Sequence, residues 1–517
     1  MLSVILAIAM CGMMAQLSKA DANLIFDAEG YNQGRYGPDP HQFYHSSDIA
    51  SSLLLVNLWD PVQTDKASHI FLTLDNPAGG DRSGPVIYRA DDLSLVYSEP
   101  RWSVVHNAHV GRFNGSDYLV FIGQSRVGNG PSTTCLLYDS TYTLAYNISA
   151  HGAGHASMGT HECHLTADGS AVIVLTEIIT FDLTAVRGPK NGQIMDNIIQ
   201  EIDIATGKLL WGWRASHHYD LLESYIEYKH DTGAYDYIHM NSVEKTTGGN
   251  FLISARHTHS IKLIERESGD VIWTLGGKYN DFVDTSAGKA TDFAWQHHAR
   301  FSNAAGTQLT MFDNHNNTST IGCKANCTRG KHVELDYENF TARLMSEFYH
   351  PESLVSAFEG SFQLLESGNA FLGWGANPTF TEHTVSGECV LDVQFDAWRP
   401  DKGYPVNYRA FKMNWKGYPT WDPEIAVVRT GTDGGFKIYV SWNGATEVEN
   451  WKLLWGFTHG GVTEPAVVVP RAGFETEIHL KYVLPFVRAV ALDKDGQILG
   501  MTAVVRLADD RETAVMS

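Results

Sequence analysis

The segment Tyr235–Gly277, with the sequence YDYIHMNSVEKTTGGNFLISARHTHSIKLIERESGDVIWTLGG, sets the interpretation of the whole chain. Short apolar runs in this segment are separated by turn-forming stretches such as TTGG and ESGD. Apolar runs of this length between Gly-rich and Ser-rich turns are typical of β-strands joined by tight turns. The segment therefore predicts three short strands, the first two of which form a hairpin across the TTGG turn.

The pattern of this segment recurs along the chain. Each copy has an apolar strand, a second strand ending near an acidic residue, a turn, and a closing strand with an aromatic residue. We find six copies, at residues 68–100, 117–149, 169–214, 249–277, 307–350 and 368–396. Short strands repeated at this period are typical of β-propellers with four-stranded blades. The fold class predicted is therefore all-β, with a six-bladed β-propeller.

The pattern changes after residue 398. Alternating strands with Asn-Gly and Asp-Gly turns follow, which is typical of a small β-sandwich. The sequence thus predicts four parts, which are a signal peptide (1–20), the propeller (21–398), a C-terminal β-sandwich-like module (405–510) and a polar tail (511–517).

Composition excludes some classes of partner. The 517 residues are 43% hydrophobic and 19% charged, which is typical of a soluble globular protein. The net charge of −21 would repel a phosphate backbone, so no nucleic-acid partner is expected. Beyond the N-terminal segment no apolar stretch reaches membrane-spanning length, so no membrane partner is expected either.

Several features predict a secreted protein or one of the secretory pathway. An apolar run, Leu2–Ala15, precedes the small residues Ser18 and Ala20, as in a signal peptide. Cys323 and Cys327 are close enough to form a local disulfide, whereas the pairing of Cys135, Cys163 and Cys389 is left open. Six glycosylation sequons are present, at Asn114, Asn147, Asn316, Asn317, Asn326 and Asn339.

The hairpin of the opening segment carries polar side chains suited to binding an anion. Alternate residues of a strand share a face, so His239 and Asn241 are expected to point the same way. A hairpin closed at the TTGG turn pairs Asn241 near Ser254 and His239 near Arg256, although a slip of one residue would reverse the face of Arg256. These groups could hold sulfate, phosphate or carboxylate, whereas a plain polar strand face is the simpler alternative.

The neighbouring repeats favour an anion-binding site over a plain polar strand face. His161 precedes the strand of the third repeat, His239 opens the fourth, and His297 with His298 precedes the strand of the fifth. The first strand of each propeller blade lines the central channel, so these histidines are expected to converge there. Together with Asn241 and Arg256 they would form an anion-binding site capable of acid–base chemistry.

Several motifs occur in the order found in one family. They are HECHLT (161–166), HMNSV (239–243), GNFLISAR (249–256), WTLGG (273–277), WQH (295–297), FDN (312–314) and SWNGAT (441–446). From about residue 60 to 510 the chain resembles the arylsulfotransferase family, in its secreted fungal branch. The resemblance implies a six-bladed propeller that moves a sulfuryl group between phenols through a sulfohistidine, with no nucleotide donor.

The resemblance also implies roles for single residues. The WQH motif puts the nucleophile at His297. His239, Asn241 and Arg256 would bind the sulfuryl oxygens, and His161 would be a further catalytic histidine. No cofactor is implied, and the partner is a small aromatic or phenolic substrate. The family more often has an acidic residue at position 298, so which of His297 and His298 faces the channel stays open.

Three alternatives remain from the sequence. The same pocket could catalyse a cyclisation without sulfur, such as a hetero-Diels–Alder closure of a quinone-methide or tropolone precursor in secondary metabolism. It could also bind a ligand without catalysis, because one fold serves many functions. Finally, the cluster His151, His155, His161 and His164 could bind zinc or copper, but its spacing matches no metal motif, so no metal site is predicted.

Overall fold

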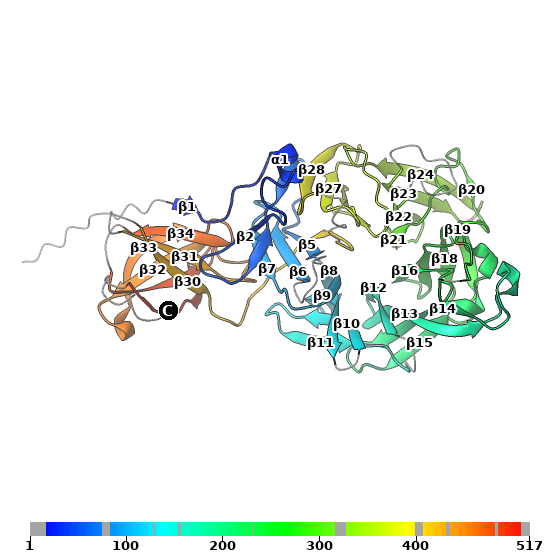
Figure 1. The fold of residues 1–517 in the computed structure, drawn as a ribbon, viewed down its shortest axis with the longest axis horizontal. Helices are drawn as coiled ribbons and strands as arrows, with labels where there is room; N and C mark the ends of the chain where they lie inside the picture. Colours follow the sequence, from blue (N-terminus) through cyan, green and yellow to red (C-terminus); the bar gives the residue numbers. More distant parts are fainter. Residues whose placement is uncertain are drawn as a thin grey trace, which may run out of the picture.

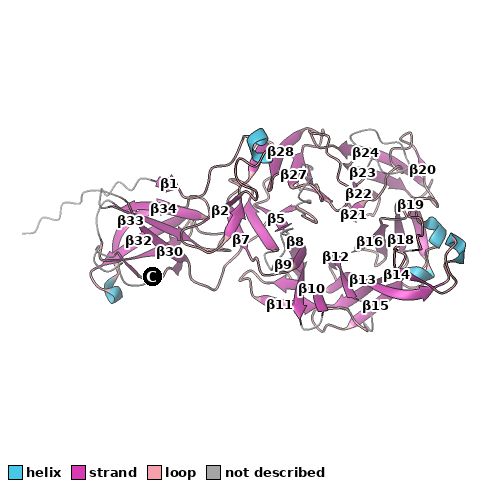
Figure 2. Cartoon of the chain, in the orientation of Figure 1, coloured by secondary structure: helices cyan, strands magenta, loops and turns pink. Residues whose placement is uncertain are grey.

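The computed structural model describes residues 17–74, 83–127, 130–152, 157–230, 232–315, 327–398, 407–430, 435–480 and 484–507. Strands make up nearly all of its regular structure, as Figure 2 shows, and the prediction of an all-β fold is confirmed. The α-helix α1 (Ala28–Asn32) and a few short 3-10 turns are the exceptions among the described residues. None of the described helices is both long and apolar enough to cross a membrane.

In the described part of the chain, six sheets of four or five strands, mainly antiparallel, are arranged in a ring (Figure 1). We call them sheets 1 to 6. Sheet 1 contains β29 (Phe411–Met413), β5 (His69–Leu74), β6 (Gly84–Arg89) and β7 (Leu95–Ser98). Sheet 2 contains β8 (Val104–Phe113), β9 (Ser116–Val127), β10 (Gly130–Tyr138) and β11 (Leu144–Ile148). Sheet 3 contains β12 (Ser157–Leu165), β13 (Ser170–Phe181), β14 (Gly192–Asp203) and β15 (Leu209–Arg214).

The other three sheets continue in chain order. Sheet 4 contains β16 (Met240–Lys245), β17 (Phe251–Ala255), β18 (Ser260–Ile264) and β19 (Val271–Gly276). Sheet 5 contains β21 (His297–Phe301), β22 (Gln308–Asp313), β23 (Arg329–Asp336), β24 (Thr341–Phe348) and β20 (Val283–Asp284). Sheet 6 contains β25 (Ser361–Leu364), β26 (Ala370–Gly373), β27 (Thr379–His383), β28 (Cys389–Gln394) and β4 (Leu55–Trp59).

Apolar cores lie between neighbouring sheets rather than inside one sheet. In β17, Phe251 and Ile253 pack toward Val172 of sheet 3, whereas Leu252 packs toward Leu309 of sheet 5. Both faces of this strand are therefore buried, which explains its continuous apolar run. Equivalent clusters join every neighbouring pair of sheets, including sheets 6 and 1, so the sheets form a closed ring.

Strands from distant parts of the chain complete the two sheets that meet where the ring closes. β4, from before the first repeat, pairs with β28 of sheet 6. β29, from after the last repeat, pairs with β5 of sheet 1. Each of these added strands covers a sheet edge that would otherwise lack a hydrogen-bonding partner. Residues 407–413 thus belong with the ring, although the sequence placed them in the C-terminal module.

The C-terminal module is a pair of sheets beside the ring (Figure 1). The first sheet contains β30 (Glu424–Arg429), β31 (Phe436–Ser441), β34 (Glu475–Leu480) and β1 (Leu17–Lys19). The second contains β33 (Glu464–Pro470), β32 (Asn450–Gly456), β35 (Phe486–Leu492), β36 (Ile498–Met501) and β37 (Val505–Arg506). They share a core that includes the buried Trp451. β1 lies inside the predicted signal peptide, whose cleavage stays a prediction.

A disulfide joins Cys135 of β10 to Cys163 of β12 and so links sheet 2 to sheet 3. Cys327 is also disulfide-bonded, whereas Cys323, its predicted partner, lies outside the described residues. Cys389 is a free thiol. Among the sequons, Asn114, Asn147 and Asn339 are exposed, and Asn316, Asn317 and Asn326 lie outside the described residues.

We expect the Cys135–Cys163 disulfide to stabilise the ring measurably, because it closes a loop with a sequence separation of 28. Replacing both cysteines by alanine should lower the free energy of unfolding by about 3–4 kcal/mol. Urea denaturation followed by tryptophan fluorescence would measure this, with Cys389→Ala as the matched control. A change no larger than that of the control would contradict the prediction.

Candidate active site

The innermost strands of four consecutive sheets carry irregularities where the histidines lie. The pairing register shifts between His106 and His109 in β8, and between Met158 and Cys163 in β12. It also shifts between Met240 and Ser242 in β16, and between His297 and Arg300 in β21. Such bulges redirect side chains and are common beside active sites.

The bulges include strained residues. Asn107, His239 and His298 have positive φ values of 61°, 53° and 53°. A positive φ is uncommon for residues other than glycine and costs free energy that the surrounding packing must supply. Three such residues, on the inner strands or immediately before one, therefore indicate that the surrounding packing holds the direction of these side chains.

The bulge in β16 changes the predicted hairpin register. The backbone N–H of Arg256 donates to the His239 carbonyl at 3.0 Å, so the pairing of these two residues is confirmed. Ser254, however, pairs with Ser242 and not with Asn241, because the bulge inserts one residue. The simple alternation that put His239 and Asn241 on one face does not hold across this point.

His239 belongs to a hydrogen-bonded chain with Asp236, His257 and Arg256. His239 Nδ1 lies 2.6 Å from the Asp236 carboxylate, and His257 Nδ1 lies 2.6 Å from the Asp236 backbone carbonyl. Arg256 donates from Nη1 to His257 Nε2 at 2.9 Å. Arginine can only donate, so His257 carries its proton on Nδ1. His239, whose side chain is 30% exposed, is left with Nε2 as an accessible base.

Charge and burial set the pKa values of the residues in this hydrogen-bonded group. Burial by itself raises the pKa of Asp236, but the hydrogen bond from His239 and the nearby charges lower it below its usual range. Burial lowers the pKa of His257 to about 4 and also lowers the pKa of Arg256. Asp236 is therefore a carboxylate at neutral pH and His257 is neutral.

His161 and His297 lie close to His239. The rings of His161 and His239 are 4.9 Å apart between centroids. The rings of His161 and His297 lie 5.8 Å and 6.3 Å from the ring of Tyr408. The three histidines predicted from separate repeats are thus brought together around Tyr408, within reach of one small ligand.

His297 has a fixed tautomer. Asn314 Nδ2 donates to the carbonyls of Ser356 and Glu359, so its Oδ1 must face His297 Nδ1 at 2.7 Å. That oxygen can only accept, which places the proton of His297 on Nδ1 and the lone pair on Nε2. Nε2 accepts a long hydrogen bond of 3.3 Å from the Glu359 N–H. Burial and the charge of Arg256 hold the pKa of His297 well below its usual range, so the imidazole is neutral.

His298 faces a different part of the channel from His297. Its Nδ1 lies 3.1 Å from the Phe362 carbonyl, and its ring is 5.4 Å from that of Phe411. After burial, the charges of Arg300 and Arg409 are the main causes that lower its pKa. Of the two adjacent histidines, His297 is therefore the one that shares the site with His161 and His239.

Asn241 is part of the wall of the site. It is fully buried, and its Nδ2 donates to the Gln296 carbonyl at 2.6 Å. This hydrogen bond holds the residue that precedes His297. One hydrogen bond of the amide thus positions the start of β21, and the role of Asn241 as a ligand of the sulfuryl oxygens stays a prediction.

Several residues of the site carried no signal in the sequence. Tyr408 stacks on His106 with ring centroids 4.6 Å apart. Arg409 is buried and forms an ion pair with Glu162 at 3.2 Å, while Glu162 also binds Arg300 at 2.5 Å. Burial raises the pKa of Glu162, but the two arginines outweigh it and hold this pKa at about 2. Tyr408 and Arg409 come from the segment between sheet 6 and β29, which was assigned to the module.

Two histidine groups bear on metal binding. The ligand atoms of Asp236, His239 and His257 lie within 4.8 Å of one another. The proton on His257 Nδ1 and the adjacent Arg256 cation do not suit a metal ion there. Of the cluster His151, His155, His161 and His164, His155 lies outside the described residues. His151 is exposed and bonds to the Gly207 carbonyl, so His151 and His161 have separate surroundings.

A closed ring of β-sheets with histidine, arginine and tyrosine side chains around its axis defines a nearly all-β, propeller-like protein with a polar axial site. The family model described as arylsulfotransferase (ASST) matches residues 102–396, which is more than half of the chain. The chain belongs to this family.

The other comparisons are distant. No curated protein matches the chain. A protein of unknown function from Bacteroides caccae is 12% identical, with 67% of this chain and 98% of that one covered and a TM-score of 0.39. The periplasmic gluconolactonase PpgL of Pseudomonas aeruginosa is 11% identical, with 85% and 96% covered and a TM-score of 0.33. Virginiamycin B lyase of Staphylococcus aureus is 9% identical, with 69% and 88% covered and a TM-score of 0.24. These likenesses imply nothing about function.

The buried neutral histidines should make the protein sensitive to mild acid. His161, His297 and His298 have pKa values well below the usual 6.5, so unfolding lets each of them bind a proton once the pH falls below that value. The free energy of unfolding should therefore fall as the pH decreases from about 6.5, by up to about 1.4 kcal/mol per histidine and pH unit. Urea denaturation across about pH 7 to pH 4.5 would measure the slope. His298→Gln should reduce it, and a flat profile would contradict the prediction.

Proposed function

We propose that this protein is an aryl sulfotransferase-like enzyme that moves a sulfuryl group between phenolic compounds through a histidine intermediate on His297. We further propose that the ring is a six-bladed β-propeller of the secreted fungal branch of the family. Membership of the arylsulfotransferase family supports a transferase activity of this kind. The observation that carries the histidine intermediate is the tautomer of His297, whose proton is held on Nδ1 by Asn314.

In the first half of the proposed reaction, His297 Nε2 attacks the sulfur atom of an aryl sulfate. An N–S bond forms as the bond between sulfur and the aryl oxygen breaks. The phenolate is an adequate leaving group because its conjugate acid has a pKa of ~10. The proton on Nδ1 stays in place, and the hydrogen bond to Asn314 Oδ1 strengthens as the ring gains positive charge.

In the second half, a second phenol attacks the sulfur atom of the sulfohistidine. Its proton passes to Nε2 of His239, whose Nδ1–H is bonded to Asp236 and whose side chain is partly exposed. An S–O bond forms, the N–S bond breaks, and neutral His297 is restored. Asp236 stabilises the resulting His239 cation, as a carboxylate does in other histidine-based catalytic sites.

Arg256 would bind the sulfuryl oxygens during both steps. Its guanidinium lies 4.9 Å from the centroid of the Trp295 ring and donates to His257 and to the Ala357 carbonyl. A partly buried cation in these surroundings stabilises charge that develops on a transferring group. The substrate would exchange one of these neutral acceptors for a charged sulfuryl oxygen.

A second candidate function, a cyclisation without sulfur, is favoured by burial. His297 is 2% exposed and Asn241 is fully buried, whereas Asp236 and His239 are partly exposed. The accessible groups are thus hydrogen-bonding groups and bases, which is what the closure of a quinone-methide or tropolone precursor would require. In that case His239 and Arg256 would bind a carbonyl oxygen, and His297 would have no covalent role.

Histidine substitutions separate the two functions. With an aryl sulfate donor and a phenol acceptor, His297→Gln should lower the transfer rate by at least about a thousandfold, because the nucleophile is lost. His298→Gln is the matched control and should retain most of the activity, since His298 faces the other part of the channel. Donor labelled with ³⁵S should leave label on a peptide containing His297.

The opposite outcomes are equally informative. Wild-type protein that neither transfers the sulfuryl group across a panel of aryl sulfates nor becomes labelled would contradict the sulfotransferase proposal. Chiral product formed from an achiral precursor without any sulfate donor, and retained in His297→Gln, would favour the cyclase.

A further inference from the structure

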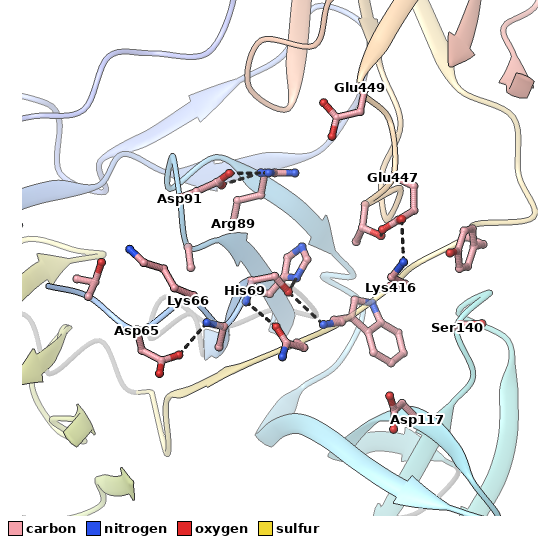
Figure 3. Close-up of a pocket in the computed structure, with 18 of the residues that line it drawn as sticks. Asp65, Lys66, His69, Arg89, Asp91, Asp117, Ser140, Lys416, Glu447 and Glu449 are labelled. Atoms are coloured by element: carbon pink, nitrogen blue, oxygen red, sulfur yellow. Dashed lines mark hydrogen bonds and ion pairs between the residues drawn. The ribbon is translucent and has the colours of Figure 1, made fainter. Parts of the chain in front are cut away.

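A cavity lies away from the histidine site, where the ring meets the C-terminal module. Its volume is about 880 Å³, which is within the range of small-ligand pockets. It is lined by residues from β4, β5, β6, β9 and the segments that follow them, and by residues from 414–418 and 446–449 (Figure 3). We call it the module cleft.

Two ion pairs lie among the charged groups of the module cleft. Arg89 forms two hydrogen bonds to Asp91, at 2.8 Å and 2.6 Å, and Lys416 binds Glu447 at 3.1 Å. Figure 3 shows these two pairs on opposite sides of the cavity. Asp91 and Lys416 have side chains that are 63% and 69% exposed, so these pairs keep hydrogen-bonding capacity toward a ligand.

The charge balance argues against an ionic ligand. The cleft is lined by five carboxylates, Asp65, Asp91, Asp117, Glu447 and Glu449, and by three cations, Lys66, Arg89 and Lys416. The excess of carboxylates disfavours an anion. Asp91 and Glu447 already have cationic partners in the cleft, which disfavours a lone cation beside these two carboxylates. His69 is buried, and burial lowers its pKa to about 4, so it adds no charge at neutral pH.

Aromatic side chains complete the cleft. Trp59 is half-buried, Trp415 is buried, and Tyr418 is 44% exposed. Donors and acceptors beside the exposed aromatic ring of Tyr418 suit a ligand with hydroxyl groups around an apolar ring face, which describes a sugar. We propose that the module cleft is a carbohydrate-binding site.

One source of carbohydrate lies on the chain itself. Ser116 and Asp117 line the cleft, and Ser116 is the hydroxyl residue of the Asn114 sequon. Asn114 is exposed in the tight turn between β8 and β9, so a glycan on it would begin at the edge of the cleft. This source depends on passage through the secretory pathway, whereas binding of a soluble saccharide does not.

The first experiment tests the glycan on Asn114. Protein secreted from a eukaryotic host would be treated in its native state with an endoglycosidase, and each site would be followed by mass spectrometry. The Asn114 glycan should be trimmed about tenfold more slowly than the glycan on Asn339, which lies in sheet 5 far along the ring. Denaturation should abolish the difference, and so should Tyr418→Ala or Glu447→Gln. Tyr279→Ala, which changes another exposed tyrosine, is the matched control.

The second experiment tests a soluble saccharide. Folded Asn114→Gln protein would be titrated with chitobiose and followed by calorimetry or NMR. Saturable binding at about millimolar Kd is expected, with loss in Tyr418→Ala and retention in Tyr279→Ala. Protection without saccharide binding identifies the chain's own glycan as the ligand, and binding without protection identifies a soluble one. Equal trimming of Asn114 and Asn339 glycans, together with no chitobiose binding, would overturn the proposal.

Discussion

The ion pair between Arg409 and Glu162 is the contact on which the channel depends. Arg409 is almost completely buried, and its Nη2 donates to the Asn241 carbonyl at 2.8 Å while Nη1 binds Glu162. Glu162 also binds Arg300 and accepts from the Val243 N–H. One carboxylate thus connects β12, β16, β21 and the segment that leads to β29. Burying these charges is costly, and removing one partner would leave another uncompensated at the axis.

This network explains why the site includes residues from outside the repeats. Arg409 is held at the axis, so the preceding residue, Tyr408, lies between His106, His161 and His297. The same segment continues into β29, which completes sheet 1. Closure of the ring and assembly of the histidine site are therefore two consequences of one segment returning to the axis.

The sequence predicted the sheets well and the site only in part. Runs such as Phe251–Ala255 are apolar except for one small serine, and this local property is enough to indicate a buried strand. The convergence of His161, His239 and His297 followed from their equivalent positions in the repeats. The bulge at Asn241 could not be predicted, because strict alternation is the default for a strand and the sequence contains no glycine there. Tyr408 and Arg409 were missed because their partners are more than a hundred residues away, and no local pattern encodes such contacts.

The hydrogen bonds of the site also constrain its chemistry. Three histidines have their protons assigned by partners that can only donate or only accept, namely His257 by Arg256, His297 by Asn314 and His239 by Asp236. In each case Nδ1 carries the proton, and Nε2 of His257 is already occupied. The lone pairs left for chemistry are those of His239, which is partly exposed, and of His297, which is covered by the Glu359 N–H. A covalent role for His297 therefore requires the substrate to displace that N–H, whereas acid–base work by His239 requires no such change. The segment around Glu359 is accordingly the element whose position decides between covalent transfer and hydrogen-bonding catalysis.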